Sequence, residues 1–449
     1  MIRAPIALLV LGTALTACAT TPAAELPVAV PQSWRAAPLA AGEPPDAYWL
    51  TATEDTTLQG LLTQAGAIDD VAIAETRARE GQALLRAARA SLFPTLSADV
   101  TVQAAKADGA PRIDTNRIGA AIAAPLDLFG GDRARSAAAV ARAAAASAEL
   151  DLARIQARRD VGQLYAALRA AQASRIAAER QTRDADDNLS LARTRADAGL
   201  ETGLAVAQAQ SAADAARARI PAFLQAETQA RLGIEALLGA APGALSDSLR
   251  PAPQPVIAAE ALLDAPAAVI ARRPDVRAAD ARLKAAGLDA SAARADRFPT
   301  ATLSAALSRS SANIGLDGAS ASGGLTLAAT LFDFGRLQAL ADAAGARADA
   351  EAILYRRTIL FAVSAVEREA DRLAQSDREA LASRAAAASA RDQAVLARAR
   401  YTSGLSSFID VLLAQRALAD AEIALAAAEG RKADAAINLA AELGLGQQR

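Results

Sequence analysis

Two short parts of the chain alternate apolar and polar residues with a period of two, which predicts β-strands. Between Thr95 and Ala104 the even positions are apolar and the odd positions carry Thr, Ser, Asp or Gln. The alternation resumes over about residues 117–127, and residues 300–309 and 323–332 repeat the arrangement. Strands of about ten residues are long enough to cross a bilayer. We therefore expect two β-hairpins, each with one apolar and one polar face.

Long Ala-, Arg- and Leu-rich stretches after each hairpin predict helices. Residues 130–199 and 335–404 contain no proline, and a rise of about 1.5 Å per residue makes each helix roughly 100 Å long. The stretches 58–92 and 203–239 are about half as long. Apolar residues are spread thinly among alanines, so these helices need close packing against neighbouring helices to be stable.

The same pattern occurs twice at a constant spacing. Phe129-Gly130 recurs as Phe334-Gly335, and five further landmarks recur at the same offset of 205 residues. Such a repeat predicts two copies of one unit, residues 58–243 and 263–449, joined by a Pro-containing linker, residues 244–262. The expected fold is mainly α with a transmembrane β part: two tandem repeats of helix, β-hairpin, long helix and helix.

Composition excludes several classes of protein. The chain has no histidine and one cysteine, so imidazole-based catalysis, the usual zinc sites and an internal disulfide framework are excluded. A net charge of −2 gives no basic surface for nucleic acid. The repeat also lacks a convergent acid, base and nucleophile. We predict no enzymatic activity, no cofactor, no metal and no nucleic-acid partner.

The N-terminus predicts export and attachment to a membrane. Residues 1–17 contain an arginine, a short apolar run and small residues before Cys18, as in a secretory signal peptide. Leu15-Thr-Ala-Cys18 resembles the lipobox of bacterial lipoproteins, which implies that Cys18 is acylated and that residues 18–57 form a lipidated extension. Ala19 stands where inner-membrane lipoproteins carry Asp, so the resemblance implies the outer membrane. The alternative is that Cys18 is an ordinary small residue near a conventional signal-peptide cleavage site and carries no lipid.

The hairpins predict an assembly of several chains. Four strands cannot close a barrel, and two isolated hairpins in a helical chain would leave open edges. If the strands span a bilayer, several copies must pool them, with apolar faces toward lipid and Ser/Thr faces toward the lumen. The alternative is the half-buried edge of a sheet in a soluble protein.

Several motifs together resemble the TolC family of outer membrane factors, and more closely its NodT/OprM-like lipoprotein branch. They are the lipobox, Trp49 with Asp55, Arg273-Pro-Asp-Val276, Leu331-Phe-Asp-Phe-Gly335 and Arg400-Tyr-Thr-Ser-Gly-Leu405. The resemblance covers nearly the whole mature chain. It implies a homotrimer with a twelve-stranded β-barrel and a helical tunnel through the periplasm, with a periplasmic adaptor (membrane fusion) protein and an inner-membrane efflux transporter as partners.

The resemblance also assigns a gate at the periplasmic end of the tunnel. Asp410 matches an acidic position there, flanked by Ile409 and Leu413, and three symmetry-related carboxylates would favour cations. Leu413 stands where some relatives have a second Asp, so the constriction is partly hydrophobic. Ser407-x-x-Asp410 is equally a capping-box spacing. The sequence therefore allows both interpretations of Asp410, a gate residue and a helix cap.

The turns between long and short helices resemble the tips where the adaptor docks. The residues concerned are Arg195, Gly199, Arg400, Tyr401 and Gly404. The glycines are equally explained by the left-handed conformation that ends a helix. Tyr401 resembles a tyrosine that helps to hold relatives closed. Ser406 stands where some relatives carry an arginine for that contact, which argues against a charged latch.

The leading hypothesis is a lipid-anchored channel of the outer membrane that extends into the periplasm and passively exports small molecules or drugs delivered by an efflux pump. A duct of a type I protein secretion system is the alternative within the same class. A periplasmic coiled-coil lipoprotein scaffold without a pore is the alternative from another class. The alternating hairpins favour the channel, because a scaffold has no need of them.

Overall fold

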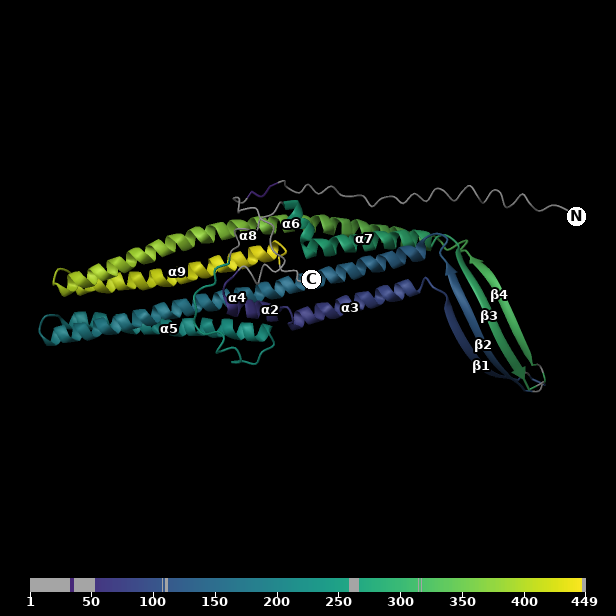
Figure 1. Cartoon of the computed structure of the whole chain (residues 1–449), viewed down its shortest axis with the longest axis horizontal. Coiled ribbons are helices and arrows are strands. Elements are labelled where there is room, and N and C mark those ends of the chain that lie inside the picture. The colour runs from purple at the N-terminus through teal and green to yellow at the C-terminus, as the bar shows by residue number, and fades with distance from the viewer. Residues whose placement is uncertain are drawn as a thin grey trace.

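The computed structural model describes residues 33–35, 53–106, 108–109, 112–257, 266–313, 315 and 317–445. The molecule is elongated, with a β-sheet at one end and helices along the rest of its length (Figure 1). Cys18 and the predicted signal peptide lie outside the described residues.

Six elements make up the first half of the fold. They are α2 (Thr56–Ala65), α3 (Asp69–Ala90), β1 (Thr95–Ala105), β2 (Ile113–Leu126), α4 (Gly131–Asp197) and α5 (Gly203–Leu237). The second half follows the same order. Its elements are α6 (Pro266–Arg272), α7 (Pro274–Ala295), β3 (Thr300–Ala312), β4 (Gly318–Ala328), α8 (Arg336–Thr402) and α9 (Phe408–Glu442). Helices α4 and α8 each have 67 residues, and α5 and α9 each have 35.

The predicted helix over residues 58–92 is divided in two. Helix α2 begins after Asp55, whose carboxylate accepts hydrogen bonds from the N–H groups of Thr57 and Leu58. It ends at Ala65 with Gly66 as its C-cap, and α3 begins after Ile68, which has an extended backbone. Ile68 is buried in the same core cluster as Leu62 of α2, so the segment between the two helices contributes an apolar side chain to the core.

The four strands form one antiparallel sheet in the order β1-β2-β3-β4. Strand β2 begins four residues before the expected 117, because Ala105 at the end of β1 pairs with Ile113. Strand β4 spans Gly318–Ala328 rather than 323–332. Its last residue pairs with Thr300, the first residue of β3, so residues 329–332 have no strand beside them. The pattern of apolar residues continues there without a pairing partner.

The two faces of the sheet differ in chemistry. Residues directly opposite each other in a ladder share a face, and Leu96, Ile122 and Ala305 lie in one such row. That apolar face is exposed in the single chain, for example at Leu96 and Leu307. The other face carries Thr, Ser, Gly and Ala, with a hydroxyl–hydroxyl hydrogen bond of 2.9 Å between Ser308 and Ser320.

The helices pack as two antiparallel hairpins, α4 with α5 and α8 with α9, and α4 also contacts α9 (Figure 1). Helices α3 and α7 lie along the parts of α4 and α8 nearer the sheet, and α7 contacts both long helices. None of the helices in the described part of the chain has the length and apolarity needed to cross a membrane.

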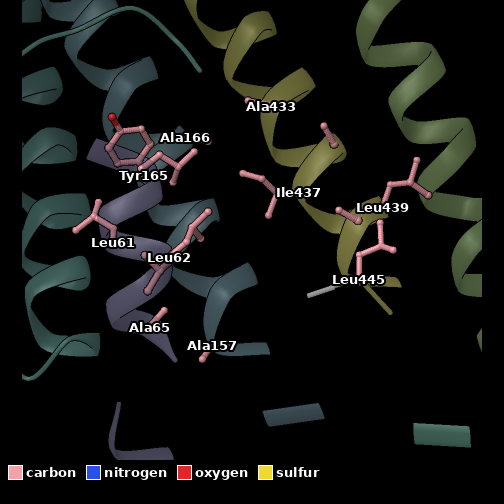
Figure 2. Packing of buried hydrophobic residues seen from close by; sticks show 14 of the residues in the cluster. Leu61, Leu62, Ala65, Ala157, Tyr165, Ala166, Ala433, Ile437, Leu439 and Leu445 are labelled. Carbon is pink, nitrogen blue, oxygen red and sulfur yellow. The ribbon is translucent and has the colours of Figure 1, made fainter. Parts of the chain in front are cut away.

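The largest hydrophobic core lies midway along the helices, where α2, α4 and α9 meet (Figure 2). Leu62 from α2, Leu168 from α4 and Ile437 from α9 are almost fully buried. Burial of such a side chain contributes about 1.5–3 kcal/mol. Elsewhere the helix contacts are mostly alanines, so this cluster gives the long helices their main apolar anchor.

A buried polar cluster beside this core connects distant parts of the sequence. The Tyr165 hydroxyl donates a hydrogen bond of 2.5 Å to Asp55, and Arg169 donates one of 2.5 Å back to the Tyr165 oxygen. Arg169 also donates to the carbonyl of Arg250. Burial and the hydrogen bond to Asp55 raise the pKa of Tyr165 to about 12. The cluster fixes α2 and the segment after α5 on α4.

Candidate functional site

The ends of the two helical hairpins farthest from the sheet form the first part of the candidate site. Gly199 and Gly404 both have a φ of +72°, a left-handed conformation that costs glycine least. The N–H of Leu200 bonds to the carbonyl of Arg195 at 2.8 Å, and Leu405 bonds to Arg400 in the same way. The two turns therefore close their long helices with the same hydrogen bond.

Tyr401 joins one turn to the other. Its side chain is 2% exposed, and its hydroxyl donates a hydrogen bond of 2.9 Å to Glu201 in the turn between α4 and α5. The Arg195 guanidinium lies over the Tyr401 ring, 4.8 Å from its centroid, and Phe408 packs against the ring at 5.3 Å. The structure thus brings Tyr401 and Arg195 together, and Glu201 completes the contact.

Sequence reasoning missed Glu201, and it argued against a charged contact at this tyrosine because position 406 is serine. The guanidinium beside Tyr401 comes instead from Arg195 in the other turn. Arg195 Nε is 3.9 Å from Glu201 Oε1. The signal was present in the sequence, because an acid and a base flank Gly199. Only the packing of the two turns could identify their partner.

The environment of Tyr401 keeps its hydroxyl protonated. Burial, together with the hydrogen bond to the Glu201 carboxylate, raises the pKa of Tyr401 to about 12. The phenol therefore stays a hydrogen-bond donor at alkaline pH values at which an ordinary tyrosine would ionise. An alanine-rich cluster surrounds this contact. It combines residues of α4 and α5 with Tyr401 at the end of α8 and Phe408 and Val411 at the start of α9, and it holds the two hairpins together at their far ends.

Asp410 lies in the first turn of helix α9, which begins after Ser407. The Ser407 N–H donates to Asp410 Oδ2 at 3.0 Å, and the Ser407 hydroxyl donates to the same oxygen at 2.8 Å. These bonds cap the helix, where a carboxylate also interacts favourably with the helix dipole. Ile409 is 43% exposed and Leu413 is 60% exposed in the single chain. Asp410 also lines an open groove of about 620 Å³ with Asp392 and Arg400 of α8.

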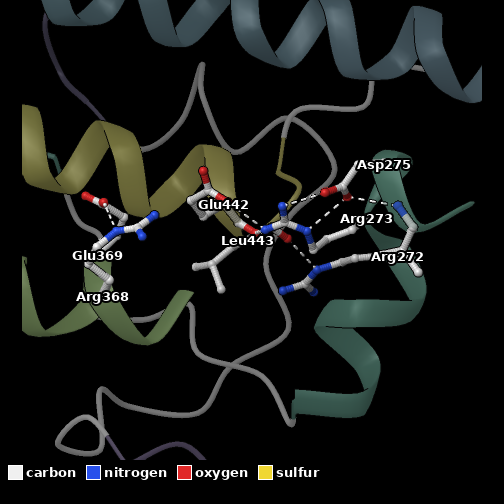
Figure 3. A network of polar contacts seen from close by, with 8 residues as sticks. Arg272, Arg273, Asp275, Arg368, Glu369, Glu442 and Leu443 are labelled. Carbon is white, nitrogen blue, oxygen red and sulfur yellow. Dashed lines mark hydrogen bonds and ion pairs between the residues drawn. The ribbon is translucent and has the colours of Figure 1, made fainter. Parts of the chain in front are cut away.

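The junction between α7 and α9 is formed by the motif Arg273-Pro-Asp-Val276 (Figure 3). The Arg273 guanidinium bonds to Asp275 and Glu442, each at 2.8 Å. Arg272 donates to the carbonyl of Leu443 at 2.9 Å. Burial alone would lower the pKa of Arg273, but the two carboxylates raise it. The motif therefore attaches the end of α9 to the start of α7.

At the other end of the molecule, aromatic residues lie where the sheet meets the helices. Phe129 and Phe298 stack with ring centroids 4.9 Å apart, and Phe334 is 92% exposed. Gly130 and Gly335 adopt positive φ angles immediately before α4 and α8. The same local sequence thus turns the chain from strand to helix twice.

The model of the outer membrane efflux protein family matches residues 68–240 and 265–445. The chain belongs to this family. The two matched ranges cover both halves of the fold, including both hairpins and both long helices. The family is made of channel proteins, which agrees with the prediction from the sequence motifs.

Relatives and solved structures place this family member among outer membrane proteins. The outer membrane protein OprJ of Pseudomonas aeruginosa is 34% identical over 72% of this chain and 68% of its own length. The pyoverdine export outer membrane protein OpmQ of the same species is 29% identical over 97% of this chain and 95% of its own. The structure of the outer-membrane channel OprN has a TM-score of 0.85 at 27% identity, covering 94% of this chain and 98% of that one.

Proposed function

We propose that this efflux protein acts as a homotrimeric exit duct in the outer membrane and passively conducts small molecules delivered from an inner-membrane pump through a periplasmic adaptor. The observation that carries the proposal is the sheet. Its apolar face is exposed in the single chain, its polar face is lined by Ser and Thr, and its two outer strands, β1 and β4, have unpaired edges in the described chain.

Three copies of the sheet supply the missing edges. Side-by-side pairing of β1 with β4 of a neighbour would give twelve strands in a closed barrel, which removes every edge. The exposed leucines and valines would then face lipid and the hydroxyls would face water. A periplasmic scaffold without a pore gains nothing from such a sheet, so this feature favours the channel.

The helices would continue the pore into the periplasm. At about 1.5 Å per residue, the 67-residue helices α4 and α8 reach roughly 100 Å beyond the membrane. In support of a duplicated unit, residues 58–243 and 263–449 each contain a long helix of 67 residues, and the family model matches both. Residues 244–262 are then the linker between the copies.

The far ends of the hairpins would provide both the aperture and the docking site for the adaptor. Asp410, Ile409 and Leu413 would form the aperture, and the cap on α9 would fix the Asp410 carboxylate at the helix end. The turns at Gly199 and Gly404 present exposed leucines, Leu200 and Leu405, to an apolar partner. Acylation of Cys18 would add a lipid anchor after removal of residues 1–17.

Single-channel recording tests the duct. The purified, acylated protein is reconstituted in planar bilayers, and Asp410→Ala is measured beside the unmodified chain. We expect discrete conductance steps from a trimer, and a larger or more frequent opening in the variant. A correctly acylated trimer that gives no channels in either form would contradict the proposal.

A further inference from the structure

The polar face of the sheet carries a single acid and a single base. Within β1 to β4 the charged residues are Asp99, Asp114, Arg117 and Arg309. Pairing assigns each one to a face, and Asp114, which pairs with Ala104, belongs to the apolar face. Asp99 lies opposite Gly119, and Arg117 lies opposite Thr101 and Ser310 on the polar face.

Arg309 belongs to the opposite face at nearly the same level. It pairs with Ile118, which in turn pairs with Val100, and these two apolar residues define the apolar face. Arg117 and Arg309 therefore lie one ladder step apart and point away from each other. The sheet therefore carries two arginines at nearly the same height, one on each face.

Asp99 and Arg117 differ in how far their side chains extend from the sheet. Gly119 is buried, and a Cβ at this position would come 2.8 Å from Asp99 Oδ1. The Asp99 carboxylate thus lies against the backbone of β2. The Arg117 side chain is exposed and makes no hydrogen bond or ion pair with any other described residue. No described residue forms an ion pair that would neutralise its charge.

In the proposed trimer, Arg117 would form a ring of three guanidinium groups near the outer mouth. The strand ends that meet the helices face the periplasm, so Arg117, near the start of β2, lies toward the cell exterior. Twelve strands about 4.8 Å apart and tilted by about 40° give a barrel radius of roughly 12 Å. An arginine side chain spans about half of this radius. The pore axis is then within one Debye length, about 10 Å at 0.1 M salt.

We propose that Arg117 determines the charge preference of the outer mouth, which favours anionic groups such as carboxylates or phosphates on the cargo. This inference rests on the proposed trimeric channel. The preference is opposite in sign to that of the Asp410 carboxylates at the periplasmic end. A molecule in transit would leave an acidic entrance and pass a basic exit.

The test is the reversal potential of single channels of the full acylated protein in a potassium chloride gradient. In Arg117→Gln we expect the permeability ratio of chloride to potassium to fall about threefold, since three charges within a Debye length of the axis are removed. Arg309→Gln is the matched control. It removes the same charge at the same height from the other face and is expected to leave the ratio unchanged.

Two further variants keep the test decisive. Asp99→Asn removes the acid of the polar face and is expected to raise the ratio. Ser310→Glu places a carboxylate opposite Arg117 and is expected to lower it as Arg117→Gln does, which covers the case in which that variant fails to assemble.

An unchanged ratio in Arg117→Gln or Ser310→Glu channels of normal conductance would overturn the inference and leave the channel intact. A change in Arg309→Gln alone would also overturn it, because it would place Arg309 in the lumen. Absence of channels in the unmodified protein would instead contradict the proposed function.

Discussion

Removal of the Tyr401 hydroxyl should make the far ends of the two hairpins separate more easily. Tyr401→Phe keeps the ring, its packing on Phe408 and the guanidinium above it, but deletes the 2.9 Å hydrogen bond to Glu201. A hydrogen bond to a charged group contributes about 1.5–3 kcal/mol. The Glu201 side chain is 18% exposed, so water replaces part of the loss and the lower value applies.

A loss of about 1.5 kcal/mol shifts the equilibrium between joined and separated turns about tenfold in each protomer. The assay is the open probability of single channels in planar bilayers, which should rise in Tyr401→Phe. Glu201→Gln should raise it by a similar factor. The double variant should add little, because both substitutions remove the same interaction.

Tyr165→Phe is the matched control. It deletes an equally buried hydroxyl that also donates to a carboxylate, but in the core midway along the helices. It should lower the thermal stability and leave the open probability unchanged. An unchanged open probability in Tyr401→Phe, or an equal rise in Tyr165→Phe, would refute the reasoning.

Three further predictions concern stability. Gly430→Ala should destabilise the protein by about 1–3 kcal/mol in thermal or denaturant unfolding, because its new Cβ would come 2.7 Å from an alanine of α4. Gly60→Ala is the control: the space around Gly60 is open, so this substitution should be neutral or slightly stabilising. Equal effects of the two substitutions would contradict the close packing at Gly430. Arg273→Leu should lower the free energy of unfolding by about 3 kcal/mol, because it leaves two carboxylates without their cation. Arg250→Leu loses a largely exposed ion pair and should lower it by less than about 1 kcal/mol. A larger loss in Arg250→Leu than in Arg273→Leu would contradict the structural role of Arg273. Tyr165 and Tyr401 each titrate at about 12 in the folded chain, so between pH 10 and pH 12 the folded chain keeps protons that the unfolded chain has lost. Unfolding should therefore become easier as pH rises through that window. A phenolate absorbance titration of Tyr165→Phe should lack one late-titrating group, and an unchanged curve would argue against the burial of Tyr165.

Much of the fold follows from local patterns in the sequence. Period-two alternation identifies strands, since each strand has one face toward lipid or core and one toward water. The glycines before α4 and α8 mark the change from strand to helix. The break after Gly66 and the early end of β4 were not predictable. The first depends on the burial of Ile68 and the second on where β3 begins, and both are tertiary constraints.

The candidate site was predictable in part for the same reason. Asp410 at the start of α9 and glycines at the turns follow from capping chemistry within a few residues. The contact of Tyr401 with Glu201 joins residues 200 positions apart. A charge beside Gly199 gives no sign of its partner until the two hairpins are packed.

The central claim is that three copies of this chain close one barrel. Electron cryo-microscopy of the purified, acylated protein in lipid nanodiscs tests it most directly. We predict a threefold-symmetric particle in which β1 of each protomer pairs with β4 of the next, giving twelve strands with apolar residues toward lipid and Arg117 in the lumen. A monomer, or an assembly in which these sheet edges remain unpaired, would contradict the account.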